Sequence, residues 1–173
     1  MIHELLISEI AAATTSVFST MLGLEAVPGE PRLGAVVGPA TGVVALVGVA
    51  GPYSGTGCIN CSETLACRAA SLMLMGEYAG IDGEVLDAMG EIANMVIGNI
   101  KTNLEDRFGA MGLSTPTVLS GERVSAKALT KTGWTIVPFT CEGETFCVQM
   151  TLAEAGAQHV HHREFHHMEL VSH

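Results

Sequence analysis

The sequence has few aromatic residues, few basic residues and no long uninterrupted apolar segment. Phe, Tyr and Trp make up 5% of its 173 residues, whereas apolar residues make up 48%. We therefore expect a core of aliphatic side chains and methionine. Eight Lys and Arg residues stand against 18 Asp and Glu residues, which gives a formal charge of −10. Nucleic acids bind basic surfaces, so this charge excludes them as partners and favours partners that present Lys or Arg.

The longest apolar run, Gly42–Gly51, is too short and too rich in glycine to cross a membrane, and the amino terminus lacks the basic region of a signal peptide. We therefore expect a cytoplasmic protein without membrane association. The five cysteines include one Cys-x-x-Cys pair, Cys58 and Cys61. Residues three apart in a strand point to opposite faces, so the pair predicts no shared metal site. We expect all five cysteines to be small, reduced residues of the core.

The length of the chain and its lack of a long linker predict a single domain over residues 1–156. A histidine-rich tail over residues 157–173 follows, and we expect it to be disordered. In this tail His162 and His166 could share a metal ion if the segment were helical. A solvated tail, or an added purification sequence that binds nickel, explains the same composition, and we predict no functional metal site.

Helical and strand patterns alternate along the domain. Helices are predicted over His3–Leu24 and residues 82–107, and a shorter helix is predicted to begin after an N-cap at Ser62. Gly29–Gly42 is predicted to be turn and short strand. The expected strands are Val43–Val49, Thr56–Asn60, Thr117–Leu119, Trp134–Phe139 and Thr145–Leu152, of which the first two and the last two form hairpins. The pattern therefore indicates the α+β class.

The order of these elements repeats, because each long helix is followed by a hairpin. Glu9-Ile10-Ala11-Ala12 aligns with Glu91-Ile92-Ala93-Asn94. The first copy has the glutamate but carries Ala12 where the second carries Asn94, so only the second copy has both polar side chains. We expect two duplicated helix-plus-hairpin units, with an antiparallel sheet packed against the long helices.

The helix predicted over residues 82–107 has one apolar side and one polar side. At about 100° per residue, Asp87, Glu91, Asn94 and Gly98 fall on one stripe, which Glu105 continues. The opposite side is apolar and consists of Met89, Ile92, Ala93, Val96, Ile100 and Leu104. Glu91 and Asn94 are three residues apart and therefore neighbours on the helix surface.

Most polar stripes on helices are solvated surfaces, and that interpretation applies here too. The stripe region is nevertheless poor in strong helix formers, since it contains Gly90, Asn94, Gly98, Asn99 and Asn103. These five residues disfavour the helix by about 4 kcal/mol relative to alanine. The composition therefore favours a functional stripe, on which Gly98 leaves room for a partner to approach Asn94.

The arrangement Asp87-x3-Glu91-x2-Asn94, followed by Pro116 after 21 intervening residues, resembles the signature of the CheC/CheX/FliY chemotaxis phosphatases. The usual spacing to the proline in that family is one residue longer. Residues 41–48, 70–76 and 90–99 also resemble CheX, and the resemblance extends over about residues 5–153. One complete motif rather than two makes the chain CheX-like rather than CheC-like.

The resemblance implies a CheC/CheX-like fold and a phosphatase that acts on the aspartyl phosphate of a CheY-type response regulator. It implies that Asn94 orients the attacking water and that Glu91 pairs with a lysine of the regulator. Asp87 and Gly98 would belong to the surrounding partner-binding surface. No cofactor of the protein's own is implied, because the regulator supplies Mg²⁺, and a homodimer is expected. The alternative is a non-catalytic adaptor or motor-switch binding module with the same fold.

Overall fold

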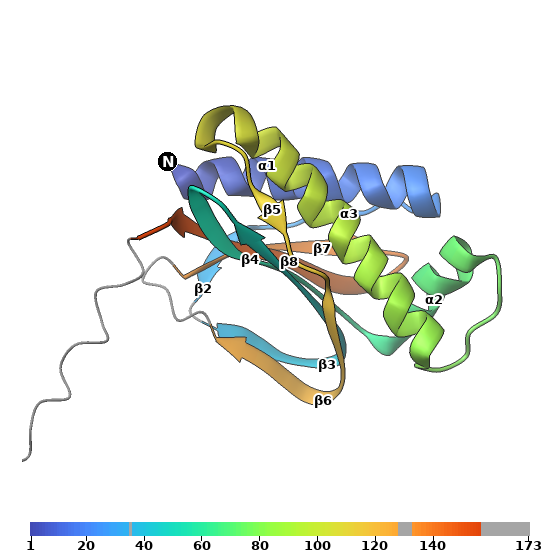
Figure 1. Ribbon diagram of the computed structural model, residues 1–173. Coiled ribbons are helices and arrows are strands. Elements are labelled where there is room, and N and C mark those ends of the chain that lie inside the picture. The colour runs from blue at the N-terminus through green and yellow to red at the C-terminus, as the bar shows by residue number, and fades with distance from the viewer. Residues whose placement is uncertain (35, 128–132, 157–173) are drawn as a thin grey trace, which may run out of the picture.

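The computed structural model describes residues 1–34, 36–127 and 133–156, which form a curved antiparallel sheet with helices on one face (Figure 1). The helices are α1 (Ile2–Val17), its continuation as the π-helix η1 (Phe18–Leu22), α2 (Glu63–Leu74) and α3 (Gly83–Phe108). The strands are β1 (Val27–Pro28), β2 (Arg32–Gly34), β3 (Val36–Ala50), β4 (Tyr53–Cys61), β5 (Gly112–Leu113), β6 (Thr117–Lys127), β7 (Trp134–Cys141) and β8 (Glu144–Glu154). The predicted α+β class is confirmed. The predicted histidine-rich tail lies outside the described residues.

The sheet joins the two helix-plus-hairpin units at its centre. Its strand order is β1-β7-β8-β4-β3-β5, and in addition β2 pairs with β7 and β6 pairs with β3. The hairpins β3–β4 and β7–β8 are therefore joined through β4 and β8. The strand β2, which follows the first long helix, pairs with the second hairpin, and β6, which follows the second long helix, pairs with the first hairpin. Each unit thus contributes a strand to the other, a connection that the sequence pattern did not predict.

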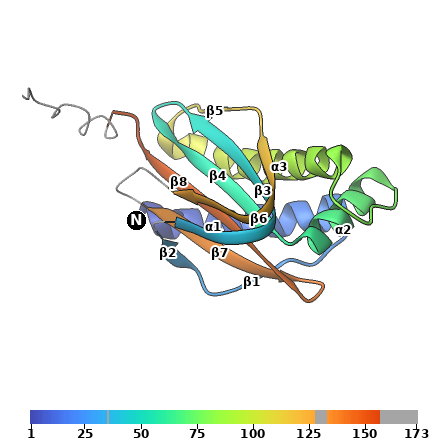
Figure 2. The same ribbon diagram turned by 90° about the horizontal axis from the view of Figure 1, so that it is seen from below.

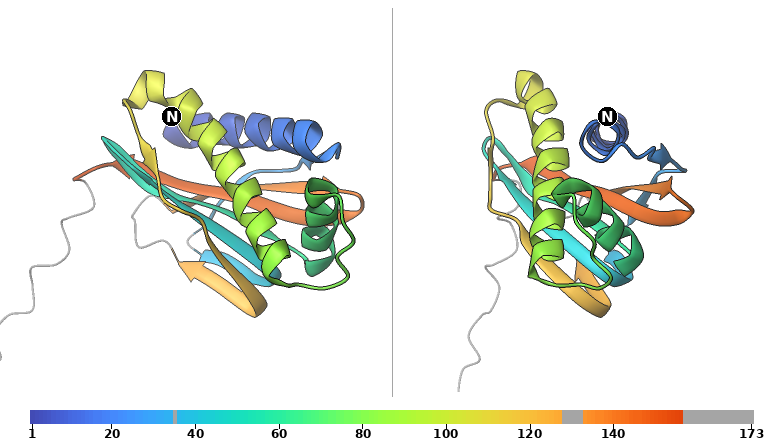
Figure 3. Two further views of the ribbon diagram at one scale, coloured as in Figure 1. Left: turned by 45° about the vertical axis from the view of Figure 1, so that its right-hand side comes forward. Right: turned by 90° about the vertical axis from the view of Figure 1, so that its right-hand side faces the viewer.

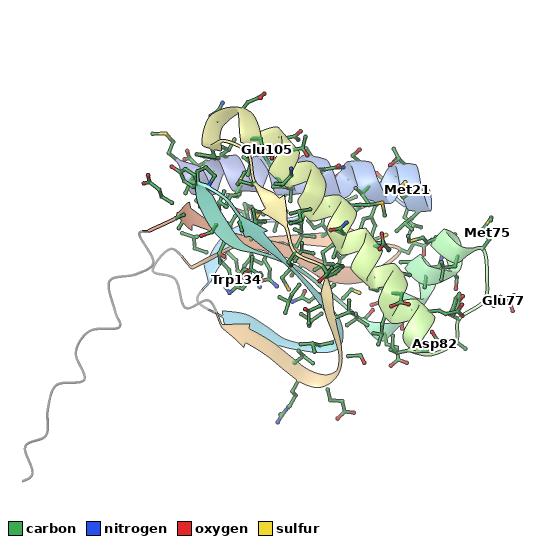
Figure 4. All side chains as sticks on the ribbon, viewed as in Figure 1. Met21, Met75, Glu77, Asp82, Glu105 and Trp134 are labelled. Atoms are coloured by element: carbon green, nitrogen blue, oxygen red, sulfur yellow. The ribbon has the colours of Figure 1, made fainter. Side chains whose placement is uncertain are left out.

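Helix α3 begins and ends where the sequence predicts. The Asp82 side chain accepts a hydrogen bond from the backbone N–H of Val85 at 2.9 Å, so Asp82 is the N-cap. Gly109 follows the last turn with φ +81°, a backbone conformation that favours glycine. Figure 4 shows Asp82 and Glu105 near opposite ends of this long helix. All six residues predicted for its apolar side are buried: Met89, Ile92, Ala93, Val96, Ile100 and Leu104.

The main core lies between the helices and the sheet. Most of its buried side chains are aliphatic, as expected, but its centre also contains aromatic rings. Phe18 of η1 stacks on Phe146 at a centroid distance of 4.7 Å, and Phe139 stacks on Phe146 at 5.1 Å. The expectation of an aliphatic core is therefore incomplete, because these three aromatic rings pack where α1 and its continuation meet the β7–β8 hairpin.

Strands β3 and β6 are longer than predicted. The prediction of turn and short strand over Gly29–Gly42 is wrong for residues 36–42, which belong to β3, and β6 extends to Lys127 instead of ending at Leu119. The two strands pair with each other, with register shifts on both sides of Ala40. Local glycine and proline residues predict a turn in this part of β3, whereas pairing with a distant strand makes it extended.

The β3–β6 ribbon bends beneath the sheet, away from the helices (Figures 1 and 2). Gly42 has φ +132° and lies opposite Gly121, which has φ +154°. A Cβ atom on Gly42 would overlap the carbonyl oxygen of Cys61. Beyond the bend, Val124 of β6 packs against a second buried cluster on the far face of the sheet, which consists of Val44, Cys58, Trp134 and Ile136.

The five cysteine thiols are free, as predicted, and four of them are buried, but the predicted core position is wrong for Cys147, which is half-buried. Cys61 belongs to the main core and Cys58 to the far-face cluster, so the two residues do point to opposite faces of β4. Burial raises the pKa of both thiols to about 12. They are therefore protonated and poorly reactive at neutral pH.

One helix in the described part of the chain is long and apolar enough to cross a membrane, namely the segment Ile2–Leu22, with a mean hydropathy of 1.5. This segment is not a long uninterrupted apolar run in the sequence, because polar residues are spaced along it. In the structure its apolar side packs into the main core through Leu6, Ile10, Ala13, Val17, Phe18 and Leu22.

Candidate functional site

The polar stripe of α3 lies on the outer side of the molecule. Glu91 and Asp87 are exposed, and Asn94 is half-buried. We expected Glu91 and Asn94 to be exposed on the long helix; this is confirmed for Glu91, whereas Asn94 is only partly exposed. Among the described residues, none of these three side chains has a hydrogen-bond or ion-pair partner. They are consequently free to interact with another molecule.

The end of the same stripe is occupied by contacts within the protein. Glu105 accepts a hydrogen bond from Lys101 Nζ at 2.8 Å and another from the backbone N–H of Met111, also at 2.8 Å. These donors, Lys101 first, lower the pKa of the Glu105 carboxyl. Glu105 thus holds the segment that follows α3 in place. Glu91 makes no such contact among the described residues.

The first repeat also uses its glutamate within the protein. Glu9 Oε2 accepts a hydrogen bond of 2.8 Å from Nδ2 of Asn103, which links α1 to α3. Ala12, which aligns with Asn94, is exposed and has no polar side chain. The first helix therefore lacks the accessible pair of carboxylate and carboxamide that α3 presents.

Pro116 lies beside the α3 stripe because Gly90 allows the chain to approach closely. A Cβ atom on Gly90 would be 3.2 Å from Val118 Cγ2 and 3.5 Å from Pro116 Cβ. Gly90 is buried directly before the exposed Glu91. The segment between β5 and β6 runs along one side of α3, while α2 lies near its other side (Figure 3). The chain thus returns to α3 at Pro116, beside Gly90 and about one helical turn before Asn94.

Gly98 is half-buried one turn beyond Asn94. A Cβ atom at this position would lie 3.5 Å from Leu113 Cδ1, an ordinary van der Waals distance. Leu113 of β5 therefore occupies part of the space that the sequence analysis left for a partner. The assignment of Gly98 to the partner-binding surface stays a prediction.

Sequence reasoning identified Asp87, Glu91 and Pro116 but not the groove that they line between α3 and β6. Leu86, Asp87, Gly90 and Glu91 of α3, together with Gly83, line a groove there with Pro116 and Val118. The glycine directly before Glu91 and the fixed spacing to Pro116 were the available signals. They could not be combined from the sequence, because nothing local indicates that β6 starts against this turn of the helix.

The arrangement suits chemistry on a group that another molecule brings. A carboxamide can donate a hydrogen bond and accept another, so Asn94 can hold a water molecule by both its hydrogen and its oxygen. The neighbouring Glu91 adds a negative charge that can pair with a cation of the same ligand.

The sequence of this chain is similar to a family of known proteins. Residues 43–140 match the family model described as Chemotaxis phosphatase CheX. The CheY-P phosphatase CheX of Thermotoga maritima is 29% identical to this chain over 123 residues, which cover 69% of this chain and 79% of that protein.

Solved structures of similar proteins share the fold. The crystal structure of chemotaxis protein CheX from Vibrio vulnificus aligns with a TM-score of 0.78 at 28% identity and covers 86% of this chain and 99% of that one. A chain of the CheX–CheY–BeF3–Mg²⁺ complex from Borrelia burgdorferi aligns with a TM-score of 0.73 at 26% identity, covering 86% of this chain and 97% of that one. The family match extends over more than half of the sequence, and the chain therefore belongs to the CheX family of chemotaxis phosphatases.

Proposed function

We propose that this protein accelerates hydrolysis of the aspartyl phosphate on a CheY-type response regulator. The observation that carries the proposal is the accessible pair of Glu91 and Asn94, which lies on α3 without partners among the described residues. A relative in the same family is a CheY-P phosphatase, and another is found in a complex with CheY. The chemistry of the pair is compatible with both.

In the proposed reaction, Asn94 enters the regulator's active site and orients a water molecule in line with the aspartyl phosphate. The water oxygen forms a bond to phosphorus, the bond between phosphorus and the aspartate oxygen breaks, and the aspartate leaves as a carboxylate. The protons of the water end on inorganic phosphate and in solvent. Such a transfer needs positioning and charge neutralisation more than it needs a protein base.

Glu91 is proposed to dock the regulator by pairing with a lysine beside its phosphorylated aspartate. Glu91 is three residues from Asn94 on the same stripe, so one bound domain can contact both side chains. Mg²⁺ belongs to the regulator in this scheme, and the protein contributes no metal ligand. In this proposal Glu91 contributes to binding of the regulator, and Asn94 orients the water.

The Asn94→Ala variant tests the proposal directly. If Asn94 holds the attacking water, the variant should bind the phosphorylated regulator but lose about 100-fold or more in dephosphorylation rate, or about 3 kcal/mol of transition-state stabilisation. Its melting temperature should stay the same or rise, because alanine favours a helix by about 0.6 kcal/mol over asparagine. The measurements are the decay of labelled phosphate on the regulator at saturating protein and a thermal melting curve.

Two results would contradict the proposal in different ways. A variant that dephosphorylates the regulator as fast as the parent would remove Asn94 from the mechanism. A parent protein that binds the phosphorylated regulator without shortening the lifetime of its phosphate would establish the adaptor or motor-switch alternative instead.

We also propose that two copies associate as a homodimer through the edges of their sheets. In the described part of the chain β6 pairs only with β3, and its Leu119 is 44% exposed. A free strand edge with an exposed apolar side chain favours pairing with another strand. Analytical ultracentrifugation should give twice the chain mass for the parent and a lower average mass for Leu119→Lys.

A further inference from the structure

A groove with an apolar floor lies beside Glu91, where α3 faces the start of β6. Leu86, Pro116 and Val118 supply its apolar surface, and Asp87 and Glu91 stand along its helical side. The remaining lining residues are glycines, so the groove contains no positive charge. It includes Glu91, one of the two residues proposed to contact the regulator.

The floor of the groove is part of the packed structure. Gly90 brings α3 within van der Waals distance of the β6 segment, since a Cβ atom there would be 3.2 Å from Val118 Cγ2. Leu86 and Val118 are partly buried and pack against the main core. The groove is therefore held in shape before any partner arrives, which lowers the entropy cost of binding.

The two carboxylates in the groove are not neutralised by the protein. Asp87 and Glu91 are four residues apart on one helix, a spacing at which like charges destabilise the helix. Three other carboxylates have partners, since Glu9 is bonded to Asn103, Glu105 to Lys101 and Glu142 to Arg68, whereas exposed carboxylates such as Asp106 have none among the described residues. The uncompensated pair beside an apolar floor points to a ligand that is both cationic and partly apolar.

We propose that this groove binds a second basic side chain of the response regulator, distinct from the lysine that pairs with Glu91. The methylene groups of an arginine or lysine would cover Leu86, Pro116 and Val118, and its charged end would pair with Asp87. Long basic side chains commonly bury their stems on apolar surface while the charge stays accessible. The inference rests on the proposed function and adds a determinant of which regulators the protein binds.

The test compares charge removal in the groove with the same change elsewhere on α3. Asp87→Asn removes the proposed partner, and Asp106→Asn is the matched control, because Asp106 is exposed on the last turn of the same helix, away from the groove. Dissociation constants are measured for the regulator held in its active form by beryllium fluoride and Mg²⁺. Asp87→Asn should weaken binding about 5- to 30-fold and reduce its dependence on salt, whereas Asp106→Asn should change it less than twofold.

The apolar half of the groove has its own pair of variants. Leu86→Ser removes apolar surface and should raise the KM for the phosphorylated regulator several-fold, with a smaller effect on kcat. Leu86→Met preserves that surface and should stay near the parent value. Melting curves of both variants separate loss of the groove from loss of the fold.

Charge reversal identifies the proposed partner residue. Each basic residue of the regulator near its phosphorylation site is replaced in turn by glutamate, and one of these replacements should restore binding to Asp87→Lys while weakening binding to the parent. If the parent protein dephosphorylates the regulator but Asp87→Asn and Leu86→Ser bind it as the parent does, the groove inference is wrong and the proposed function stands. If the parent neither binds the regulator nor dephosphorylates it, both are wrong.

Discussion

At the scale of single residues, Glu91 and Asn94 differ in their contacts from several other polar residues of the two long helices. Glu9, Glu105 and Asn103 are also polar residues of the two long helices, yet each makes a short hydrogen bond within the protein. Glu91 and Asn94 make none among the described residues while lying on the outer side of α3. A residue whose polar groups are satisfied by its own fold contributes to stability, whereas an accessible unsatisfied pair is available for a ligand.

The docking role of Glu91 predicts an ordered series of variants. Glu91→Ala should weaken association with the phosphorylated regulator about 5- to 100-fold, and Glu91→Lys should weaken it more, because lysine repels the regulator's lysine. Both effects should shrink as salt screens the pair. Both variants should stay folded, since Glu91 is exposed. Fluorescence titration at two ionic strengths measures this, with Asp106→Lys as a control for the charge change on the same helix. Binding that is indifferent to charge and salt would contradict the docking role.

At the scale of helices and strands, the two repeats have diverged in what their helices contact. The β4–β8 pairing joins two hairpins that follow similar helices. In the first helix, however, the glutamate is bonded to Asn103 of the second, so it ties the helices together. The glutamate of the first repeat, Glu9, therefore links the two helices, whereas that of the second repeat, Glu91, faces solvent.

Replacement of Glu9 should affect stability rather than turnover. Glu9→Ala removes one hydrogen bond to Asn103 and should lower the free energy of unfolding by about 0.5 to 1.5 kcal/mol. The dephosphorylation rate should stay within about twofold of the parent, because the first repeat has Ala12 in place of the asparagine. Urea unfolding gives the free energy of unfolding, and the decay of the regulator's phosphate gives the dephosphorylation rate, both measured on the same samples.

Asn103→Ala provides the matched partner variant for this contact. It should cost a similar free energy, and the double variant should cost less than the sum of the two, as expected for residues in contact. A loss of turnover in Glu9→Ala comparable to that in Glu91→Ala would show instead that the first helix is functional.

At the scale of the whole molecule, helices cover one face of the sheet and the bent β3–β6 ribbon contributes to covering the other. The bend depends on Gly42, where positive φ and close approach to the Cys61 carbonyl both exclude a side chain. The straight part of the same ribbon brings the beginning of β6 toward α3, and so places Pro116 and Val118 beside Glu91.

Gly42→Ala should therefore be strongly destabilising. Its methyl group would overlap backbone atoms that cannot move independently, and a loss of about 3 kcal/mol or more, or failure to fold, is expected. Gly112→Ala is the control, because a Cβ atom there would be 3.8 Å from its nearest neighbour, Ala50 O. The control should cost less than about 1 kcal/mol. The melting temperatures of both variants are measured. Equal values would show that the bend does not require glycine at position 42.

The sequence by itself determined the elements whose signals are local. The cap at Asp82, the stop at Gly109 and the spacing of apolar residues specify α3 and its polar stripe, because a helix forms hydrogen bonds between residues four apart. The same periodicity places Glu91 next to Asn94 without any knowledge of the fold. The hairpin β7–β8 was also predictable, since its turn residues lie between two short patterns of apolar residues.

Only the tertiary structure decided the features that depend on distant pairing. Residues 36–42 contain glycine and proline and look like a turn, yet they are strand because β6 pairs with them. The exchange of β2 and β6 between the repeats, the bond from Glu9 to Asn103 and the groove formed by Gly90 with Pro116 and Val118 also join residues far apart in the chain. Strand pairing and packing depend on which surfaces meet in space, and the local sequence does not encode that choice.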